Sequence, residues 1–296
     1  MLNVIGGSAS TYLAYKISRV GQFPIIPIES KVFPDGERYV RVLGDVEGKR
    51  IALIQSMYRN PDSYLIEFIF ISRTLKELGA KEVIGVIPYF PYARQDTRFN
   101  PGEAVSLDIV SRLIEESNVD KVITVDMHLH RYSSIKEVFR IPAENISAVD
   151  EIARYLANNY KLESPVIIGP DEESEQWAKR AASVLECDYD VLEKRRISAE
   201  EVEIVPRKVS VKGRDVVIVD DIISTGGTMA EAIKMLLKQG ARRVIGACTH
   251  AILAGNALER IYRAGAHDVI ATDTVPSPIS VVSVAELLAK TLREHD

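Results

Sequence analysis

Two segments of the chain repeat one another, and this repeat limits the folds that the chain can adopt. LKELGAKEVIG (75–85) and LLKQGARRVIG (236–246) both have the pattern of a helix end, a glycine turn and the start of a strand. Two further pairs occur in the same order: GKRIALIQSM (48–57) with GRDVVIVDDI (213–222), and KVITVD (121–126) with DVIATD (268–273). Three ordered matches favour a duplicated α/β domain over the alternative that buried α/β strands merely look alike.

Short β-branched runs alternate with amphipathic stretches elsewhere, which is typical of mostly parallel sheets flanked by helices. The predicted strands are Ile51–Gln55, Val83–Pro88, Lys121–Val125, Val166–Gly169, Val216–Val219, Val244–Cys248 and Asp268–Thr272. The predicted helices are Tyr64–Leu78, Ser106–Ser117, Asp150–Tyr160, Glu173–Leu185, Met229–Lys238 and Ala254–Ala264. Asp35-Gly36, within the alternating stretch 32–42, predicts a hairpin. We expect two duplicated domains, 1–143 and 144–296, with the last helix free to pack back on the first domain.

Composition narrows the function. A length of 296 residues suits about two domains. The net charge of −5 gives no general attraction to nucleic acid or to an anionic membrane, so local groups must capture any anionic ligand. Cys187 and Cys248 form no disulfide or CxxC pattern, which fits a reducing compartment. With no signal peptide or membrane-spanning stretch, we expect a soluble, cytoplasmic protein.

The stretch VVIVDDIISTGG (216–227) predicts a ligand site. In open α/β sheets, ligands bind beyond the carboxyl ends of the strands, and a Ser/Thr/Gly turn leading into a helix can hold a phosphate with backbone N–H groups. Asp220 and Asp221 would repel a phosphate, so they suit sugar hydroxyls or a metal ion. The alternative is an ordinary strand-end turn with solvated acids. Gln55 and Ser56 stand at the matching positions of the first half, which lacks this turn, so we assign the site to the second half.

This stretch resembles the ribose 5-phosphate loop of the type I phosphoribosyltransferase fold. Nearly the whole chain is similar to the ribose-phosphate pyrophosphokinase family, which implies two phosphoribosyltransferase-like domains. The resemblance implies transfer of the β,γ-diphosphoryl group of ATP to the C1 hydroxyl of ribose 5-phosphate, with Mg²⁺ as cofactor. It implies that Asp220 and Asp221 bind the ribose hydroxyls and associated Mg²⁺. The implied phosphate-binding residues are Ser224, Thr225, Gly226, Gly227 and Thr228.

The resemblance also implies an ATP site in the first domain. In VIPYFPYARQDTRF (86–99), which is otherwise read as a solvated polar loop, it assigns ATP contacts to three residues: Arg94, Gln95 and Asp96. Thr97 departs from the base that many relatives carry. The hairpin residues that would meet the adenine are Phe33, Asp35 and Glu37. In the family this hairpin reaches a neighbouring subunit, which implies a homo-oligomer with a shared active site.

Two further segments bear on the metal ion. In VDMHLH (125–130) the histidine spacing allows a zinc site, but no supporting Cys or acidic ligands follow. The resemblance instead assigns His128 to Mg-ATP and leaves His130 without a role. Asp171 precedes a helix and suits an N-cap, while the resemblance makes it a Mg²⁺ ligand. The following residues, Glu172-Glu173-Ser174, depart from the family pattern.

The charge run VLEKRRISAEEVE (191–203) is typical of a solvated loop. The resemblance identifies Lys194 and Arg196 within it as the catalytic cations, which would stabilise negative charge on the transferring group. Two alternatives remain beside the diphosphokinase: a phosphoribosyltransferase, and a non-catalytic regulatory homologue of the same fold. Oligomer size, allosteric control and nucleotide preference are not predicted.

Overall fold

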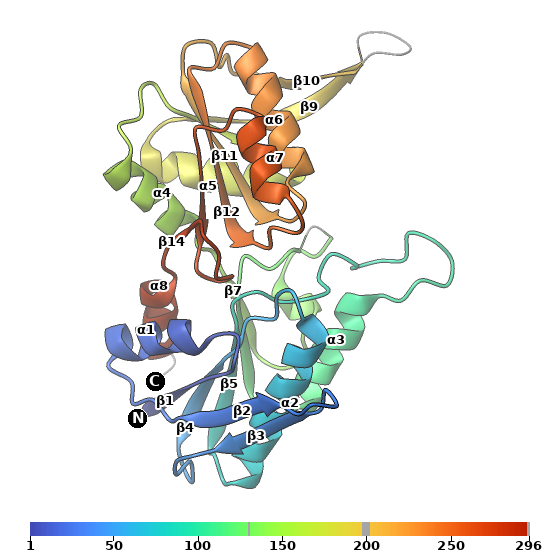
Figure 1. Ribbon diagram of the computed structural model, residues 1–296, viewed down its shortest axis with the longest axis vertical. Coiled ribbons are helices and arrows are strands. Elements are labelled where there is room, and N and C mark those ends of the chain that lie inside the picture. Colours follow the sequence, from blue (N-terminus) through green and yellow to red (C-terminus); the bar gives the residue numbers. More distant parts are fainter. Residues whose placement is uncertain (130, 197–201, 295–296) are drawn as a thin grey trace. The chain divides into compact units, whose positions relative to one another are not determined.

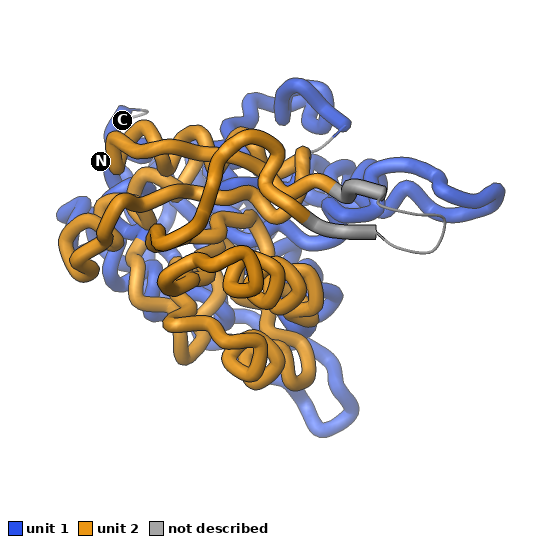
Figure 2. The backbone as a smooth tube through the Cα atoms, turned by 90° about the horizontal axis from the view of Figure 1, so that it is seen from above, with its two compact units in different colours: residues 1–146, 284–296 blue, residues 147–283 orange. Residues whose placement is uncertain are grey.

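The computed structural model describes residues 1–129, 131–196 and 202–294, without the side chains of 194–196 and 202–204. The chain forms two compact units (Figure 2): unit 1 comprises Met1–Ile146 and Val284–Asp296, and unit 2 comprises Ser147–Ser283. The division follows residue 146 and not 143, because strand β7 (Ala143–Ile146) pairs with the sheet of unit 1. The last helix, α8 (Ala285–Glu294), belongs to unit 1.

Unit 1 is built on a five-stranded parallel sheet with the order β1-β4-β5-β6-β7. The other strands of this sheet are β1 (Leu2–Gly6), β4 (Arg50–Ile54), β5 (Glu82–Ile87) and β6 (Lys121–Val125). Its other helices are α1 (Thr11–Gly21), α2 (Pro61–Glu77) and α3 (Ser106–Glu116) (Figure 1). A short 3₁₀ helix, η1 (Ile135–Glu137), also belongs to this unit. The predicted hairpin is confirmed: β2 (Ile28–Val32) pairs antiparallel with β3 (Arg38–Val42), and Gly36 lies in its turn at φ +95°.

Unit 2 is built on a seven-stranded sheet with the order β10-β9-β8-β11-β12-β13-β14, parallel except for the β9–β10 pair. Its strands are β8 (Val166–Gly169), β9 (Asp188–Arg196), β10 (Val202–Pro206), β11 (Asp215–Ile223), β12 (Arg243–Ala251), β13 (Asp268–Thr272) and β14 (Ser280–Val282). Its helices are α4 (Val149–Asn159), η2 (Glu172–Ser174), α5 (Glu175–Leu185), α6 (Gly227–Lys238) and α7 (Ala257–Arg263). In the part of the chain that is described, no helix has the length and apolar character needed to cross a membrane.

The duplication predicted from the sequence repeat is confirmed, and it extends to backbone geometry. Strands β4, β5, β6 and β7 follow one another in the sheet of unit 1 as β11, β12, β13 and β14 do in unit 2. The glycines of the repeated turn, Gly79 and Gly240, have φ values of +87° and +89°, where a side chain would be strained. Each carbonyl accepts a 2.8 Å hydrogen bond, from the N–H of Gly48 and Gly213 respectively. The helix-to-strand turn therefore has the same backbone conformation and the same hydrogen bond in both units.

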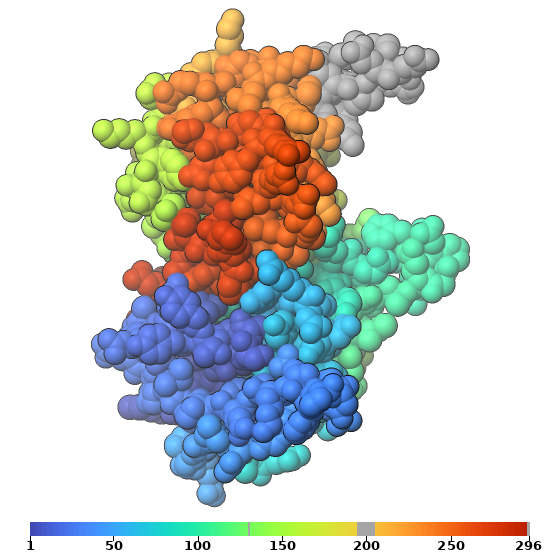
Figure 3. Space-filling view, in the orientation of Figure 1, coloured from blue at the N-terminus to red at the C-terminus, as the bar shows by residue number. Residues whose placement is uncertain are grey.

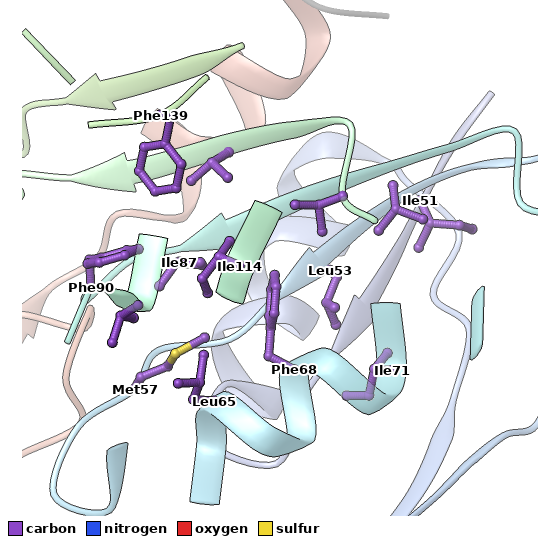
Figure 4. Packing of buried hydrophobic residues seen from close by; sticks show 14 of the residues in the cluster. Ile51, Leu53, Met57, Leu65, Phe68, Ile71, Ile87, Phe90, Ile114 and Phe139 are labelled. Carbon is purple, nitrogen blue, oxygen red and sulfur yellow. The ribbon is translucent and has the colours of Figure 1, made fainter. Parts of the chain in front are cut away.

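Both sheets are buried on two faces. In unit 2, Val216 and Ile218 of β11 pack in the cluster that contains α6, whereas Val217 and Val219 pack in the cluster that contains α4 and α5. Successive residues of a strand point to opposite faces, so a continuous β-branched run suits a sheet covered on both sides. The core of unit 1 gathers around Phe68 of α2, which lies against apolar side chains of several elements (Figure 4). Buried sheets leave the strand ends and loops as the places for polar ligands.

Several predicted elements differ in their bounds from the observed ones, and three of the differences lie near the acid pair or the predicted catalytic cations. The run 191–203 is not simply a loop, because residues up to Arg196 extend β9 and those from Val202 form β10. Strand β11 does not stop at Val219 but runs to Ile223, alongside β12. Helix α5 starts at Glu175, because the preceding residues form the 3₁₀ turn η2. The strands β1, β7 and β14 and the helix α1 are among the elements that had no sequence prediction.

Candidate functional site

The acid pair lies within the last residues of β11 in unit 2. Asp221 is 4% exposed and Asp220 is half-buried. Burial raises the pKa of the Asp220 carboxyl well above its usual value, and the neighbouring carboxylates of Asp221 and then Asp171 raise it further. The carboxyl groups of Asp171, Asp220 and Asp221 therefore interact electrostatically at this end of the sheet. Such a group of oxygens is stabilised by a cation or by hydroxyl donors.

The turn after β11 presents unused hydrogen-bond donors. Among the described residues, none accepts a hydrogen bond from the backbone N–H groups or the side-chain hydroxyls of Thr225–Thr228. Gly226 is the N-cap of α6 and adopts the left-handed conformation, with φ at 72°. A Cβ atom on Gly226 would lie 2.8 Å from the carbonyl oxygen of Ala257, so this position requires glycine. Free amides beside a helix N-terminus form an anion-binding concavity.

Asp171 lies at the end of β8, the strand next to β11. Its Oδ1 accepts a 3.0 Å hydrogen bond from the N–H of Ser174, whose hydroxyl is 3.1 Å from the N–H of Asp171. This capping box is the structural role that the sequence left open for Asp171. The negative charge of Asp171 also contributes to the raised pKa of Asp220, after burial and Asp221. The two roles are compatible.

A pocket of about 580 Å³ lies beside these groups. It is lined by Pro170, Asp171, Glu172, Glu173, Leu192, Glu193, Thr228, Glu231 and Ala232. The lining joins the loop after β8, the strand β9 and the start of α6, all within unit 2. Over the described ranges, no three His, Cys, Asp or Glu side chains are grouped closely enough to hold a metal ion by themselves. A cation bound here would take part of its coordination from water or from a ligand.

The corresponding sheet edge of unit 1 is closed by an internal ion pair. Glu67 of α2 is fully buried, and its carboxylate lies 3.3 Å from Nη1 of Arg38 on the hairpin. It accepts hydrogen bonds from the Ser30 hydroxyl (2.5 Å), from Nε2 of Gln55 (2.8 Å) and from both the hydroxyl and the N–H of Ser8 (2.6 and 3.2 Å). Gln55 and Ser56 stand at the positions of Asp220 and Asp221, so this edge of unit 1 carries neutral side chains where unit 2 carries the acid pair.

The predicted adenine-binding residues lie in the turn between β2 and β3. Phe33 is 40% exposed and meets the ring of Tyr39 edge-on at 5.9 Å between centroids. Nζ of Lys31 lies over both rings. Asp35 accepts a 3.1 Å hydrogen bond from the N–H of Glu37, which tightens the turn. The hairpin thus presents an exposed aromatic ring on a fixed turn.

The predicted nucleotide loop between β5 and α3 projects from the surface of unit 1 (Figure 3). The exposed guanidinium of Arg94 has no hydrogen-bond or ion-pair partner among the described residues. Nε2 of Gln95 donates to the Thr97 carbonyl at 3.0 Å and to Glu103 at 3.1 Å, while Asp96 pairs with Arg131 at 3.4 Å. Arg94 is therefore available to a ligand, whereas Gln95 and Asp96 also hold the loop.

Glu103 organises this loop and was missed from the sequence. It accepts hydrogen bonds from the side chain and N–H of Asn100 and from the N–H of Phe99. These bonds, led by that of the Asn100 side chain, lower the pKa of Glu103. A sequence signal existed, because Asn100, Pro101 and Gly102 predict a turn that an acid three residues on can close.

The remaining predicted residues are distributed between the units. His128 follows β6 in unit 1, directly after Met127 and Asp126, whose φ of 38° is unusual for a residue other than glycine. His130 lies outside the described residues. The backbone of Lys194 and Arg196 belongs to β9, opposite Ile204 and Val202 of β10. The side chains of Lys194 and Arg196 lie outside the description.

Comparison with known proteins identifies the family. A family model for the N-terminal domain of ribose phosphate pyrophosphokinase matches residues 2–117, and a phosphoribosyl transferase domain model matches 134–283. The chain is 44% identical to the ribose-phosphate pyrophosphokinase of Methanopyrus kandleri, over 97% of both chains. It is 42% identical to that of Methanothermobacter thermautotrophicus, over 98% of this chain and 100% of the relative.

A solved structure agrees with these sequence matches. The crystal structure of phosphoribosylpyrophosphate synthetase from Mycobacterium smegmatis superposes with a TM-score of 0.88 and 30% identity. The match covers 99% of this chain and 98% of that chain, so it includes both units. The resemblance that the sequence motifs indicated, with its two-domain α/β fold, is confirmed. The chain belongs to the ribose-phosphate pyrophosphokinase family of enzymes.

Proposed function

We propose that this enzyme transfers the β,γ-diphosphoryl group of ATP to the C1 hydroxyl of ribose 5-phosphate, giving 5-phosphoribosyl 1-pyrophosphate and AMP. The observation that carries the proposal for this chain is the end of β11, where an acid pair meets a turn of free amides. Acids suit hydroxyl donors and amides suit a phosphate, and a sugar phosphate offers both. Family membership supplies the reaction.

In unit 2, the ribose 5-phosphate ligand would place its phosphate against Thr225–Thr228 and its hydroxyls against the acid pair. The N–H groups of the turn and the hydroxyl of Thr228 donate to phosphate oxygens. Asp220 and Asp221 accept from the ribose hydroxyls, which fixes the sugar with its C1 hydroxyl presented for reaction. Holding both ends of a small substrate supplies the orientation on which this kind of catalysis depends.

Mg²⁺ fits the donor set of this site. Asp171 and Asp220 offer hard carboxylate oxygens, and the charge of Asp171 contributes, after burial and Asp221, to the raised pKa of Asp220. Mg²⁺ keeps several waters and binds through one or two carboxylates together with substrate phosphates, which suits a site without a complete protein cage. When bound, the ion neutralises phosphate charge during transfer. We also assign His128 to the Mg-ATP complex.

On the ATP side, the free guanidinium of Arg94 would bind phosphate, and Gln95 and Asp96 would shape the loop around the nucleotide. The exposed ring of Phe33, with Asp35 and Glu37, would contact the adenine of ATP bound to another subunit. The working enzyme would then be a homo-oligomer with a shared active site. We place this oligomer in the cytoplasm.

Lys194 and Arg196 are the proposed catalytic cations. Both lie where β9 leaves the body of unit 2, beyond its pairing with β8. As the diphosphoryl group moves, negative charge develops on its oxygens, and cations at this position stabilise it. The C1 hydroxyl loses its proton and forms the bond to the β-phosphorus, while the bond from that phosphorus to the AMP oxygen breaks. No covalent protein intermediate is required.

The direct test is product formation from purified enzyme with Mg-ATP and ribose 5-phosphate. We expect AMP and 5-phosphoribosyl 1-pyrophosphate in equal amounts, dependent on both substrates. AMP formation without ribose 5-phosphate would indicate a different acceptor. If ribose 5-phosphate binds but no AMP or 5-phosphoribosyl 1-pyrophosphate forms, the chain is a non-catalytic member of the family. Pyrophosphate-dependent exchange with a free base would indicate a phosphoribosyltransferase.

A further inference from the structure

The peptide units at 223–225, where β11 leads into the turn 224–228, accept hydrogen bonds from a separate segment, 253–261. The carbonyl oxygen of Ile223 accepts from the N–H of Leu253 at 3.1 Å, and that of Ser224 accepts from the N–H of Ala254 at 3.0 Å. The carbonyl oxygen of Thr225 accepts a 2.8 Å hydrogen bond from Nη1 of Arg260, on α7. Three successive carbonyls of the turn are thus fixed on one side.

Fixing these carbonyls fixes the direction of the amides. A trans peptide unit is planar, and its C=O and N–H bonds point in opposite directions. With the carbonyls of Ser224 and Thr225 turned toward 253–261, the N–H groups of Thr225 and Gly226 point away from it. These N–H groups belong to the set that lacks acceptors among the described residues. The Thr225 carbonyl is the one in this series that is held by a side chain.

Arg260 is well placed and free to perform this role. Its helix α7 lies beside α6 (Figure 1), and the N–H of Arg260 donates a 2.9 Å hydrogen bond to the carbonyl of the N-cap residue Asn256, so Arg260 lies in the regular first turn of α7. Nη1 lies 3.9 Å from where a Cβ on Gly227 would be, so the guanidinium runs along the turn. Within the described ranges, no carboxylate forms an ion pair with Arg260. Its positive charge is therefore not neutralised by a carboxylate of the described residues.

We propose that Arg260 is a positioning residue for the 5-phosphate of the sugar substrate. Its hydrogen bond to Thr225 directs the Gly226 N–H toward the phosphate, and its unneutralised charge favours an anion on the turn. This inference rests on the proposed assignment of the turn as the ribose 5-phosphate site. It adds a residue from outside the turn, some thirty-five positions along the chain.

The test compares Arg260 with Arg263 on the same helix. Arg263 is 79% exposed and pairs with Glu259 at 2.7 Å, so R263A removes a similar guanidinium that does not contact the turn. We expect R260A to weaken ribose 5-phosphate binding, by calorimetry and by KM, about tenfold or more, because a charged hydrogen bond is lost. The KM for ATP and the kcat at saturation should stay close to wild type, and R263A should match wild type throughout.

Conservative variants separate the two contributions of Arg260. Lysine retains the charge and a donor, so R260K should recover most of the affinity; glutamine retains a neutral donor, so R260Q should recover less. Unchanged affinity in R260A, or an equal loss for ribose 5-phosphate and ATP, would overturn the role of Arg260. If T228V also leaves ribose 5-phosphate affinity unchanged, the turn is not the phosphate site and the proposed function fails with it. If T228V weakens binding and R260A does not, this inference alone is wrong.

Discussion

Glu67 of unit 1 and Thr228 of unit 2 occupy the same position of the duplicated fold. The residues that follow them, Phe68 and Met229, each cover the glycine of the next strand. A Cβ on Gly85 would lie 2.8 Å from Phe68, and one on Gly246 would lie 3.2 Å from Met229. At one helix position, therefore, unit 1 carries a buried carboxylate and unit 2 carries a hydroxyl.

The difference shows how a duplicated site was closed in one copy. In unit 1, Glu67 is an internal anion, and donors from four segments converge on it. In unit 2, the donors of Thr225–Thr228 converge on no protein group among the described residues. The first arrangement stabilises the fold and the second leaves its donors for an external anion. Unit 1 is therefore structural at the place where we propose that unit 2 binds the sugar phosphate.

The largest effect should come from the cations that unit 1 lacks altogether. Strands β9 and β10 extend the sheet of unit 2 beyond β8, whereas β1 is the edge strand among the described strands of the unit 1 sheet. Replacing Lys194 or Arg196 with Ala should lower kcat by about 10³-fold or more, by analogy with arginine contributions in other phosphoryl transfers. The affinity for ribose 5-phosphate should change little. Rates and calorimetry on K194A, R196A and the exposed-surface control K179A measure this.

A second outcome would contradict the assignment of Lys194 and Arg196 as catalytic cations. If kcat held while ribose 5-phosphate affinity collapsed, Lys194 and Arg196 would be binding residues and not catalytic cations. If both constants held, the β9–β10 hairpin would have no part in the reaction.

Glu67 should have the largest effect on stability. E67A leaves the buried Arg38 guanidinium and several polar groups without their anion, and breaking such a pair costs about 3–5 kcal/mol. E67Q retains the shape but loses the charge, so it should destabilise less. Urea unfolding measures the change, with E77Q at the exposed end of the same helix as the control. A stability of E67A equal to that of E77Q would show that the network contributes nothing.

The sequence predicted the duplication because its signals are local. A glycine at positive φ, a helix end and a β-branched run lie within eleven residues of one another, and each copy repeats them. The turn at 224–228 was predicted for the same reason. Its neighbour Asp171 left two roles open, and the structure shows that the cap and the acid field coexist.

The Glu67 network and the Arg260 contact have no local signal. The partners of Glu67 lie on β3, on the β2 strand and after β1 and β4, so only the folded sheet brings them together. In the sequence, Glu67 is the one charged residue of the apolar run 64–72. The β9–β10 hairpin was missed for a different reason. Strand β10 is the edge strand of its sheet, and charged residues are common on edge strands, so the charge run gave no alternating pattern of a half-buried strand.

Thr228 should have a moderate effect on binding and little effect on stability. T228V removes the hydroxyl at the helix start while keeping the shape of the side chain. Ribose 5-phosphate affinity should fall about tenfold, since the loss of a hydrogen bond to a charged group costs about 1.5–3 kcal/mol. The melting temperature should stay near that of wild type, in contrast with E67A. T74V, on the corresponding helix of unit 1, should change neither quantity.

The smallest expected effect is a change in stability on replacing Asp220 of the acid pair. Unit 1 carries a neutral residue, Gln55, at the same position. A carboxyl whose pKa is raised by folding binds its proton more tightly in the folded state, so stability falls as pH rises from the unfolded-state pKa through the raised value. D220N, which imitates Gln55, removes this penalty. Without ligand or Mg²⁺, D220N should be more stable than wild type at neutral pH, by about 1.4 kcal/mol for each unit by which the pKa is raised. The gain should vanish in acid below the ordinary Asp range.

Adding Mg²⁺ should narrow this difference, because the cation stabilises the ionised wild-type acid and has less to bind in D220N. Melting curves across pH, with and without Mg²⁺, measure both effects, and ribose 5-phosphate binding should weaken in D220N although the protein is more stable. D188N provides the control, since Asp188 is paired with Arg214 at 2.8 Å away from the site. If D220N is less stable than wild type at neutral pH, the acids of unit 2 are structural, as Glu67 is in unit 1, and the contrast between the two units is lost.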